Sequence, residues 1–144
     1  MIVRYLESDI QGSDREVKAP TFTSRRFLLR EDGLDFSFHD TVLYAGTETP
    51  IWYKHHLEAV YCIGGEGELE VDGGPTYAVR PGMFYALDGH EKHFLRATTD
   101  LRMMCVFTPA LTGQEVHDED GAYPLNPEPP GTGPNGFHPT SKEA

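Results

Sequence analysis

The sequence is short of basic side chains. Its 144 residues include 12 Lys and Arg against 23 Asp and Glu, which gives a formal net charge of −11. An acidic surface repels phosphate backbones, so nucleic acid is not expected as a partner. Long apolar runs are also missing, since no segment approaches the roughly 20 apolar residues of a membrane span. The N-terminus carries Arg4, Glu7 and Asp9 where a signal peptide would be apolar. We therefore expect a cytoplasmic protein with no membrane partner.

Cysteine and helical periodicity are scarce as well. Cys62 and Cys105 are far apart in the chain, and each lies in an apolar run. Reduced thiols are the default for such a pair inside the cell. No apolar stripe follows the 3.6-residue period of a helix, and the one short candidate lies near Leu6–Ile10. A chain of this length is expected to form one domain without long helices.

What the sequence does contain is a series of short runs rich in aromatic and β-branched residues. Turn signals at Asp72–Gly74 and Pro81–Gly82 separate neighbouring runs. Close, even spacing of such runs predicts an all-β domain, an antiparallel sandwich or barrel. The candidate strands cover residues 24–29, 36–44, 58–63, 67–71, 75–79, 83–86, 93–97 and 101–107.

The composition changes after residue 124. Residues 125–144, LNPEPPGTGPNGFHPTSKEA, are dense in Pro and Gly and contain few core-forming side chains. Such a segment cannot bury enough apolar surface to order itself. The sequence therefore predicts a barrel domain over residues 1–124 and a flexible C-terminal tail over residues 125–144.

The stretch from Gly46 to Gly65, GTETPIWYKHHLEAVYCIGG, has the spacing of the first cupin motif. In that motif two histidines two residues apart normally bind a metal, but here Trp52 and Lys54 occupy their positions. The carboxylate position is kept as Glu58. A carboxylate at the start of an apolar strand is costly unless it is paired or bound to a metal. The motif indicates either an unusual metal ligand set or no metal.

A degenerate second cupin motif begins at Gly82 and keeps its histidine as His93. Tyr85 follows Gly82 in the inward phase of the strand, so Glu58, Tyr85 and His93 would converge inside a closed barrel. Iron accepts this oxygen-rich set, as do zinc and manganese. Three protein ligands would leave open positions for a substrate. The alternatives are a packed aromatic at Tyr85 and a hydrogen-bonded imidazole at His93.

Three further histidines lie near these turns. Their spacing fits solvated loop positions better than ligand positions: His55, His56 and His90.

Longer blocks narrow the interpretation. They read SRR at 24–26, DTVLYAGTE at 40–48, HLEAVYCI at 56–63, GEGE at 65–68 and MCVFTPALTGQEVHDEDGAYP at 104–124. In these blocks the chain resembles the ectoine synthase family, and the resemblance covers about residues 1–124. It implies a single-domain cupin barrel of the jelly-roll type, a homodimer, and iron as Fe2+, or another divalent metal in the purified protein.

The resemblance also implies an activity. These enzymes are hydro-lyases that close N-γ-acetyl-L-2,4-diaminobutyrate, with loss of water, into ectoine, a compatible solute made under osmotic stress. The family's metal ligands fall on Glu58, Tyr85 and His93. Its candidates for proton transfer fall on Tyr53, Glu115 and His117. Its substrate-binding positions fall on Phe22, Ser24, Arg26, His39, Thr41, Cys105 and Phe107.

Four positions depart from the pattern of the family. Phe22 stands where Trp is common, His39 where Asn is expected, Trp52 where His is common, and Gly64 where Glu is frequent. We expect these changes to affect substrate affinity or range more than the class of reaction. Two alternative functions are another metal-dependent cupin enzyme, such as an oxygenase or sugar isomerase, and a non-catalytic barrel that binds a small molecule.

Overall fold

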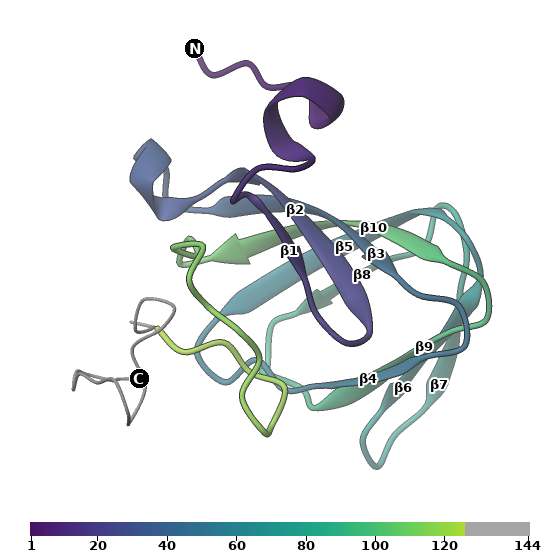
Figure 1. Cartoon of the computed structure of the whole chain (residues 1–144). Helices are drawn as coiled ribbons and strands as arrows, with labels where there is room; N and C mark the ends of the chain where they lie inside the picture. Colours follow the sequence, from purple (N-terminus) through teal and green to yellow (C-terminus); the bar gives the residue numbers. More distant parts are fainter. Residues whose placement is uncertain (126–144) are drawn as a thin grey trace, which may run out of the picture.

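The computed structural model describes residues 1–125 as two antiparallel sheets facing each other (Figure 1). One sheet has the strand order β1-β2-β3-β10-β5-β8 and the other β4-β9-β6-β7. The predicted all-β sandwich or barrel is confirmed. The tail predicted for residues 125–144 lies outside the described residues except for Leu125. The elements are η1 (Leu6–Ile10), β1 (Glu16–Lys18), β2 (Phe22–Leu28), η2 (Arg30–Asp32), β3 (Ser37–Leu43), β4 (Glu48–Ile51), β5 (Leu57–Gly64), β6 (Gly67–Val71), β7 (Thr76–Val79), β8 (Phe84–Leu87), β9 (His93–Ala97) and β10 (Leu101–Thr108).

Two strands, β1 and β4, were not predicted from the sequence. Both are short edge strands, and β1 pairs only with β2 while β4 pairs only with β9. Pro50 lies within β4 opposite Phe94. Proline has no N–H to donate to a neighbouring strand, so it is tolerated in an edge strand, where one side is unpaired, and it hides the strand signal in the sequence. The short helix candidate near Leu6–Ile10 is a single π-helical turn, η1.

The inner faces of the two sheets form the core. On β5 the buried side chains alternate with more exposed ones, and on β10 the same alternation buries Leu101, Met103, Cys105 and Phe107. At one end of the barrel the inner face turns polar, with Ser24, Arg26, His39 and Glu58 among the buried side chains. Buried polar groups are costly without partners. This polar end is therefore where a functional site is expected.

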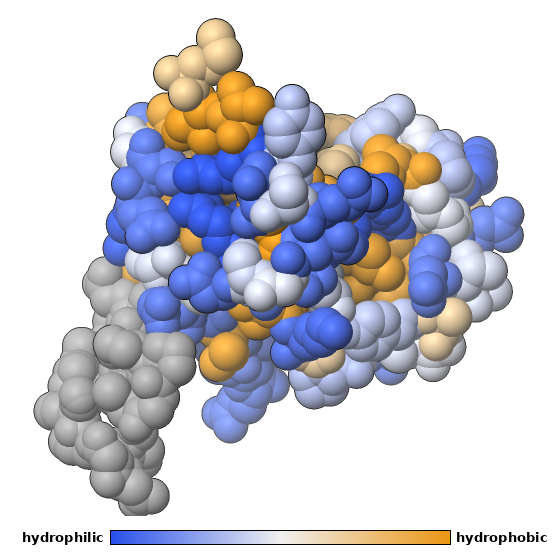
Figure 2. All heavy atoms as spheres, turned by 45° about the horizontal axis from the view of Figure 1, so that its top comes forward, coloured by the Kyte–Doolittle hydropathy of each residue, from blue (hydrophilic) through white to orange (hydrophobic). Residues whose placement is uncertain are grey.

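Two features bear on partners. No helix within residues 1–125 is long and apolar enough to cross a membrane. Figure 2 shows hydrophilic side chains over much of the face that includes the N-terminal turn.

An ion-pair cluster attaches the N-terminal segment to this face of the barrel. Asp32 accepts hydrogen bonds from Arg4 at 2.9 Å, Arg15 at 3.2 Å and the Leu29 backbone N–H at 2.9 Å. Burial alone would raise the pKa of Asp32, but these donors outweigh it and lower the pKa from 3.8 to about 2. The carboxylate therefore stabilises the fold above its unfolded pKa, and this contribution is lost as the pH falls through about 2.

We expect Asp32→Asn to lower the free energy of unfolding by about 1 kcal/mol near neutral pH. The difference from the parent should shrink as the pH falls from about 4 to about 2, because the parent carboxylate becomes protonated. Urea unfolding at a series of pH values measures this. Glu31→Gln is the matched control, since the Glu31 side chain pairs with Arg15 but is 71% exposed. A difference independent of pH would contradict the assignment.

Candidate functional site

A cavity of about 40 Å³ lies between the sheets at the polar end of the barrel. It has room for only a few water molecules. A larger groove of about 380 Å³ adjoins it, between the β1–β2 hairpin and the segment after β10. In Figure 1 that segment, green to yellow, leaves β10 and runs across one end of the barrel. Four side chains line both spaces and so separate them: Phe22, Thr49, His117 and Tyr123.

Most of the predicted site residues line the cavity. Those that do are Phe22, Ser24, Thr41, Tyr53, Glu58, Tyr85, Cys105, Phe107 and His117. The four that do not are Arg26, His39, His93 and Glu115.

The predicted metal ligands come from three adjacent places in the fold. Glu58 and Tyr85 lie on the paired strands β5 and β8 and both line the cavity. His93 begins β9 and lies in edge contact with Tyr85, with ring centroids 5.9 Å apart. Tyr85 and His93 also share a neighbouring hollow of about 260 Å³. The barrel thus brings an imidazole and a phenol together, with a carboxylate on the strand beside the phenol.

The atoms of this set fit a cation. Among residues 1–125, four buried side-chain atoms have no hydrogen-bond partner, namely Glu58 Oε1, His93 Nε2 and the two ring nitrogens of His56. His93 Nδ1 lies 3.0 Å from the carbonyl oxygen of Glu91, so Nδ1 carries the proton and the Nε2 lone pair stays free. This is the usual support for a metal-binding histidine. Within residues 1–125 no cluster of three His, Cys, Asp or Glu side chains could hold a metal, so the phenol of Tyr85 would have to complete the set.

Burial keeps these groups neutral when no ion is bound. It raises the pKa of Glu58 to about 8, with a smaller opposing effect from the Cys105 thiol. Burial also raises the pKa of Tyr85 well above 10 and lowers that of His93. A divalent cation favours the deprotonated forms of all three ligands, so its binding would oppose the raised pKa values of Glu58 and Tyr85 and reinforce the lowered pKa of His93.

A second group of side chains lies at the boundary with the groove. The Tyr53 hydroxyl is 2.8 Å from His117 Nε2. Burial lowers the pKa of His117 to about 4 and raises that of Tyr53 well above 10. The neutral imidazole therefore accepts the phenol proton in a hydrogen bond. Phe107 packs edge-on against Tyr53 with ring centroids 5.0 Å apart, and Phe22 lies 5.3 Å from His117.

Two further aromatic side chains pack against Tyr53 and Phe107, and the sequence did not predict either of them. Tyr123 stacks on Tyr53 with ring centroids 5.2 Å apart and an interplanar angle of 15°. His56 is buried rather than solvated as predicted, and it contacts Phe107 and Tyr123 edge-on. Neither position stood out in the spacing of the two cupin motifs. For Tyr123 the only signal was an aromatic residue directly before the change in composition.

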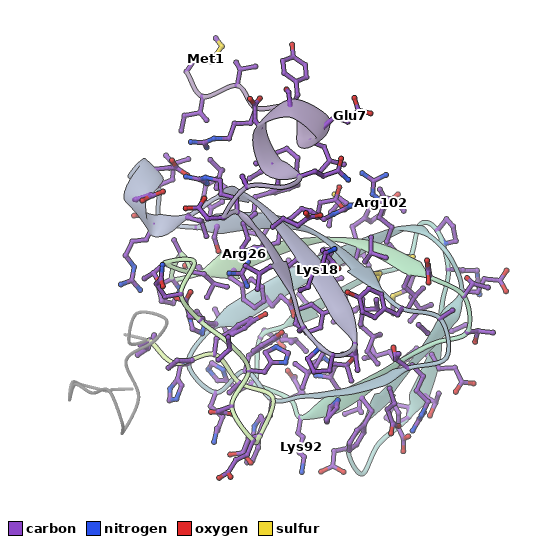
Figure 3. The ribbon with its side chains drawn as sticks, in the orientation of Figure 1. Met1, Glu7, Lys18, Arg26, Lys92 and Arg102 are labelled. Atoms are coloured by element: carbon purple, nitrogen blue, oxygen red, sulfur yellow. The ribbon has the colours of Figure 1, made fainter. Side chains whose placement is uncertain are left out.

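The opposite wall is polar and comes from β2, β3 and β10. Ser24 is paired with Thr41, and Arg26 with His39, in the register of β2 and β3. Arg26 Nε donates to Ser24 Oγ at 3.1 Å and its Nη1 donates to the Gly113 carbonyl oxygen at 3.2 Å. Figure 3 shows Arg26 between β2 and the segment that follows β10. Arg26 thus places a buried positive charge directly behind the cavity lining.

Glu115 has a different environment from the other predicted catalytic residues. It is buried, and its two carboxylate oxygens accept the backbone N–H groups of Thr112 and Gly113 at 2.7 and 2.9 Å. It lines the outer groove and not the cavity. In this structure Glu115 holds the segment after β10 in shape.

The two residues in the vacated histidine positions have a structural explanation. Lys54 forms an ion pair with Asp120 at 2.7 Å, and both Lys54 and Lys92 lie over the ring of Trp52. The backbone N–H of Trp52 also donates to the Gly121 carbonyl oxygen. Trp52 and Lys54 therefore attach the segment that carries His117 to the rest of the barrel.

Comparisons with known proteins identify the family of this chain. The family model described as ectoine synthase matches residues 1–127. The L-ectoine synthase of Desulfatibacillum aliphaticivorans is 59% identical over 128 residues, 87% of this chain and 98% of that protein. The L-ectoine synthase of Halalkalibacterium halodurans is 57% identical over 118 residues, 81% of this chain and 92% of that protein.

Solved structures give the same picture. The crystal structure of ectoine synthase from P. lautus is 58% identical, covers 92% of this chain and 96% of its own, and superimposes with a TM-score of 0.80. An RmlC-like cupin from Shewanella frigidimarina, 16% identical, covers 76% of this chain and 90% of its own with a TM-score of 0.60, which supports the cupin fold alone. The chain belongs to the ectoine synthase family, enzymes of the lyase class with a cupin fold.

Proposed function

We propose that this chain closes N-γ-acetyl-diaminobutyrate into ectoine, with iron held by Glu58, Tyr85 and His93. The observation that carries the metal assignment is that Glu58 Oε1 and His93 Nε2 are buried without a partner among the described residues, while Glu58 shares the cavity with Tyr85 and the His93 ring contacts Tyr85. Membership of the ectoine synthase family supports the reaction. Carboxylate, phenolate and imidazole form a set that iron accepts well, with zinc or manganese as substitutes.

The reaction joins two ends of one flexible molecule. The neutral α-amine attacks the carbonyl carbon of the acetamide, and an amidine C=N bond forms. The amide oxygen leaves as water, which takes both protons of the amine nitrogen. The bound ion would supply Lewis acidity toward a substrate oxygen. Amide carbons are poor electrophiles, and the amine must be neutral to attack. The protein must therefore also fold the substrate and move protons.

Tyr53 and His117 are suited to the proton transfers. Burial lowers the pKa of His117 to about 4, so the ring is neutral, and the proton that the amine nitrogen releases as it attacks the acetamide carbon can pass to His117 Nε2. The Tyr53 hydroxyl, 2.8 Å from that nitrogen, can pass a proton on to the departing oxygen. Both side chains line the cavity. Glu115 would contribute by holding the segment that carries His117.

Substrate folding falls to the two walls of the cavity. Phe22 and Phe107 would contact the methylene groups and the acetyl methyl group. Arg26 would attract the carboxylate, since guanidinium favours planar anions, with Ser24, Thr41 and Cys105 in the cavity lining and His39 behind them. Holding reactive ends together contributes strongly to intramolecular reactions. Because the cavity of about 40 Å³ is smaller than the substrate, binding requires the boundary with the groove to open.

We expect Arg26→Ala to raise KM for the substrate by roughly 10- to 100-fold, because the positive charge behind the cavity lining, which would attract the substrate carboxylate, is lost. Bound metal should stay at the parental level. Steady-state kinetics and metal analysis measure both. Arg25→Ala is the matched control, because Arg25 directly precedes Arg26 on β2 but its guanidinium pairs with Asp40 at 2.7 Å instead of contacting Ser24. Unchanged kinetics in Arg26→Ala would remove Arg26 from the site.

One assay tests the reaction itself. Iron-loaded protein is incubated without oxygen with N-γ-acetyl-diaminobutyrate, and ectoine is measured by chromatography. Ectoine formation in proportion to protein supports the proposal. Folded, iron-loaded protein that forms no ectoine would overturn it, and oxygen consumption with another substrate would favour the oxygenase alternative. Binding without turnover would favour a non-catalytic barrel.

Assembly and location are part of the same proposal. By its resemblance to the family, the enzyme is proposed to act as a homodimer in the cytoplasm, in the response to osmotic stress. Light scattering of the purified protein measures its mass, and a monomer at working concentration would contradict the dimer.

A further inference from the structure

A chain of buried hydrogen bonds lies behind Ser24. The Leu111 backbone N–H donates to Ser37 Oγ at 3.1 Å, and Ser37 Oγ is 2.9 Å from His39 Nε2. His39 Nδ1 is in turn 3.4 Å from Ser24 Oγ, which also accepts Arg26 Nε–H at 3.1 Å. Ser37, His39 and Arg26 are each at most 1% exposed. Among the side chains of this relay, Ser24 alone lines the cavity.

The direction of each bond follows from counting donors and acceptors. Ser37 Oγ accepts the Leu111 N–H, so its own hydroxyl proton needs an acceptor, and within residues 1–125 His39 Nε2 is the partner in reach. A Ser37 proton pointing elsewhere would leave a buried donor unsatisfied, which is costly. His39 Nε2 must then be unprotonated. Burial, with the neighbouring Arg26 charge, lowers the pKa of His39 well below 6.5, which agrees with a neutral ring.

A neutral ring with a bare Nε2 carries its proton on Nδ1. That proton can only point at Ser24 Oγ, which then accepts two hydrogen bonds, one from His39 and one from Arg26. A hydroxyl with both lone pairs occupied has only its proton left to offer. Since Ser24 lines the cavity, that proton points into it.

We propose that Ser37 and His39 are positioning residues that hold Ser24 as a hydrogen-bond donor toward the cavity. With Arg26 directly behind it, this wall then selects an acceptor oxygen of an anionic group, the carboxylate of the substrate, and rejects its N–H groups. The inference deepens the proposed function and rests on it for the identity of the ligand. The direction of the relay itself depends only on the protein.

The relay also explains how a histidine serves at position 39. A neutral imidazole has one accepting and one donating nitrogen, and a carboxamide likewise has an accepting oxygen and a donating NH2 group. His39→Asn should therefore preserve the direction of the relay, whereas His39→Leu should abolish it. In His39→Leu the Ser24 proton is free to turn toward other partners.

The first test reads the tautomer directly, on the metal-free full chain with ¹⁵N-labelled histidine. The His39 signal is assigned by its loss in His39→Asn. We expect a protonated Nδ1 and an unprotonated Nε2. A protonated Nε2, or a doubly protonated ring, at neutral pH would overturn the inference. This readout needs no turnover, so it stands apart from the ectoine assay.

The second test is a double-mutant cycle on KM for N-γ-acetyl-diaminobutyrate. Ser24→Ala and His39→Leu are each expected to raise KM by roughly 3- to 10-fold, and the double variant should be no worse than Ser24→Ala alone. His39→Asn should restore KM. Ser37→Ala should match His39→Leu, with its thermal midpoint measured because it also leaves the Leu111 N–H unpaired. Additive losses would show that His39 does not act through Ser24. No turnover in the parent would instead refute the proposed function and leave the tautomer result to decide the relay.

Discussion

Tyr85→Phe is expected to lose bound iron and cyclase activity while keeping its fold. The substitution removes one oxygen and preserves the ring that packs against His93, so the loss would report the hydroxyl alone. Glu58→Ala and His93→Ala should behave in the same way, because each removes a buried atom that has no other partner. We expect activity to fall by at least about 100-fold, since several kcal/mol of charge stabilisation would disappear with the ion.

Metal analysis of the purified variants, with the ectoine assay alongside, measures both losses. Tyr61→Phe is the matched control, because Tyr61 loses the same atom, is 47% exposed on β5, and lines neither the cavity nor the neighbouring hollow. Thermal unfolding verifies that each variant is folded. A Tyr85→Phe protein with full metal content would remove Tyr85 from the ligand set, and full activity without iron would refute the metal-dependent mechanism.

The second large effect is expected at the hydrogen bond between Tyr53 and His117. Tyr53→Phe and His117→Ala should each lower kcat by about 10²- to 10⁴-fold, the usual contribution of a positioned acid or base. Bound iron should remain, because neither side chain belongs to the proposed ligand set. The two losses should not add in the double variant, since either substitution breaks the same 2.8 Å contact.

Steady-state kinetics of iron-loaded protein separates kcat from KM in these variants. His55→Ala is a suitable control, because His55 lies two residues from Tyr53 and does not line the cavity. Parental kcat in both single variants would exclude the pair from proton transfer. A loss in KM alone would instead assign the pair to substrate binding.

The strands could be predicted from the sequence because their signals are local. Aromatic and β-branched runs between Gly, Pro and Asp located most strands to within a residue or two. The exceptions were β1 and β4, whose short length and, in β4, Pro50 conceal the pattern. Edge strands of this kind exist because a neighbour pairs with them, and a neighbour distant in sequence leaves no local trace.

The residues of the site were predicted less completely than the strands. The position of Glu58 followed from motif spacing, whereas strand phase left Tyr85 open between a ligand and a packed aromatic, and the family resemblance favoured the ligand. Nothing in the sequence indicated that His56 is buried or that Tyr123 stacks on Tyr53. Tyr53 and His56, between β4 and β5, both contact Tyr123, which lies more than 50 residues further along the chain. Contacts over such separations depend on how the two sheets close.

By itself the sequence determined an acidic all-β domain and its family, because composition, alternation and motif spacing are local properties, and it predicted side chains for metal binding and proton transfer. Only the tertiary structure decided which of those side chains meet. It left Glu58 Oε1 and His93 Nε2 buried without partners, turned Glu115 toward backbone N–H groups, and set Ser37 and His39 behind Ser24. The physical reason is that burial and hydrogen-bond direction arise from the packing of strands far apart in the chain.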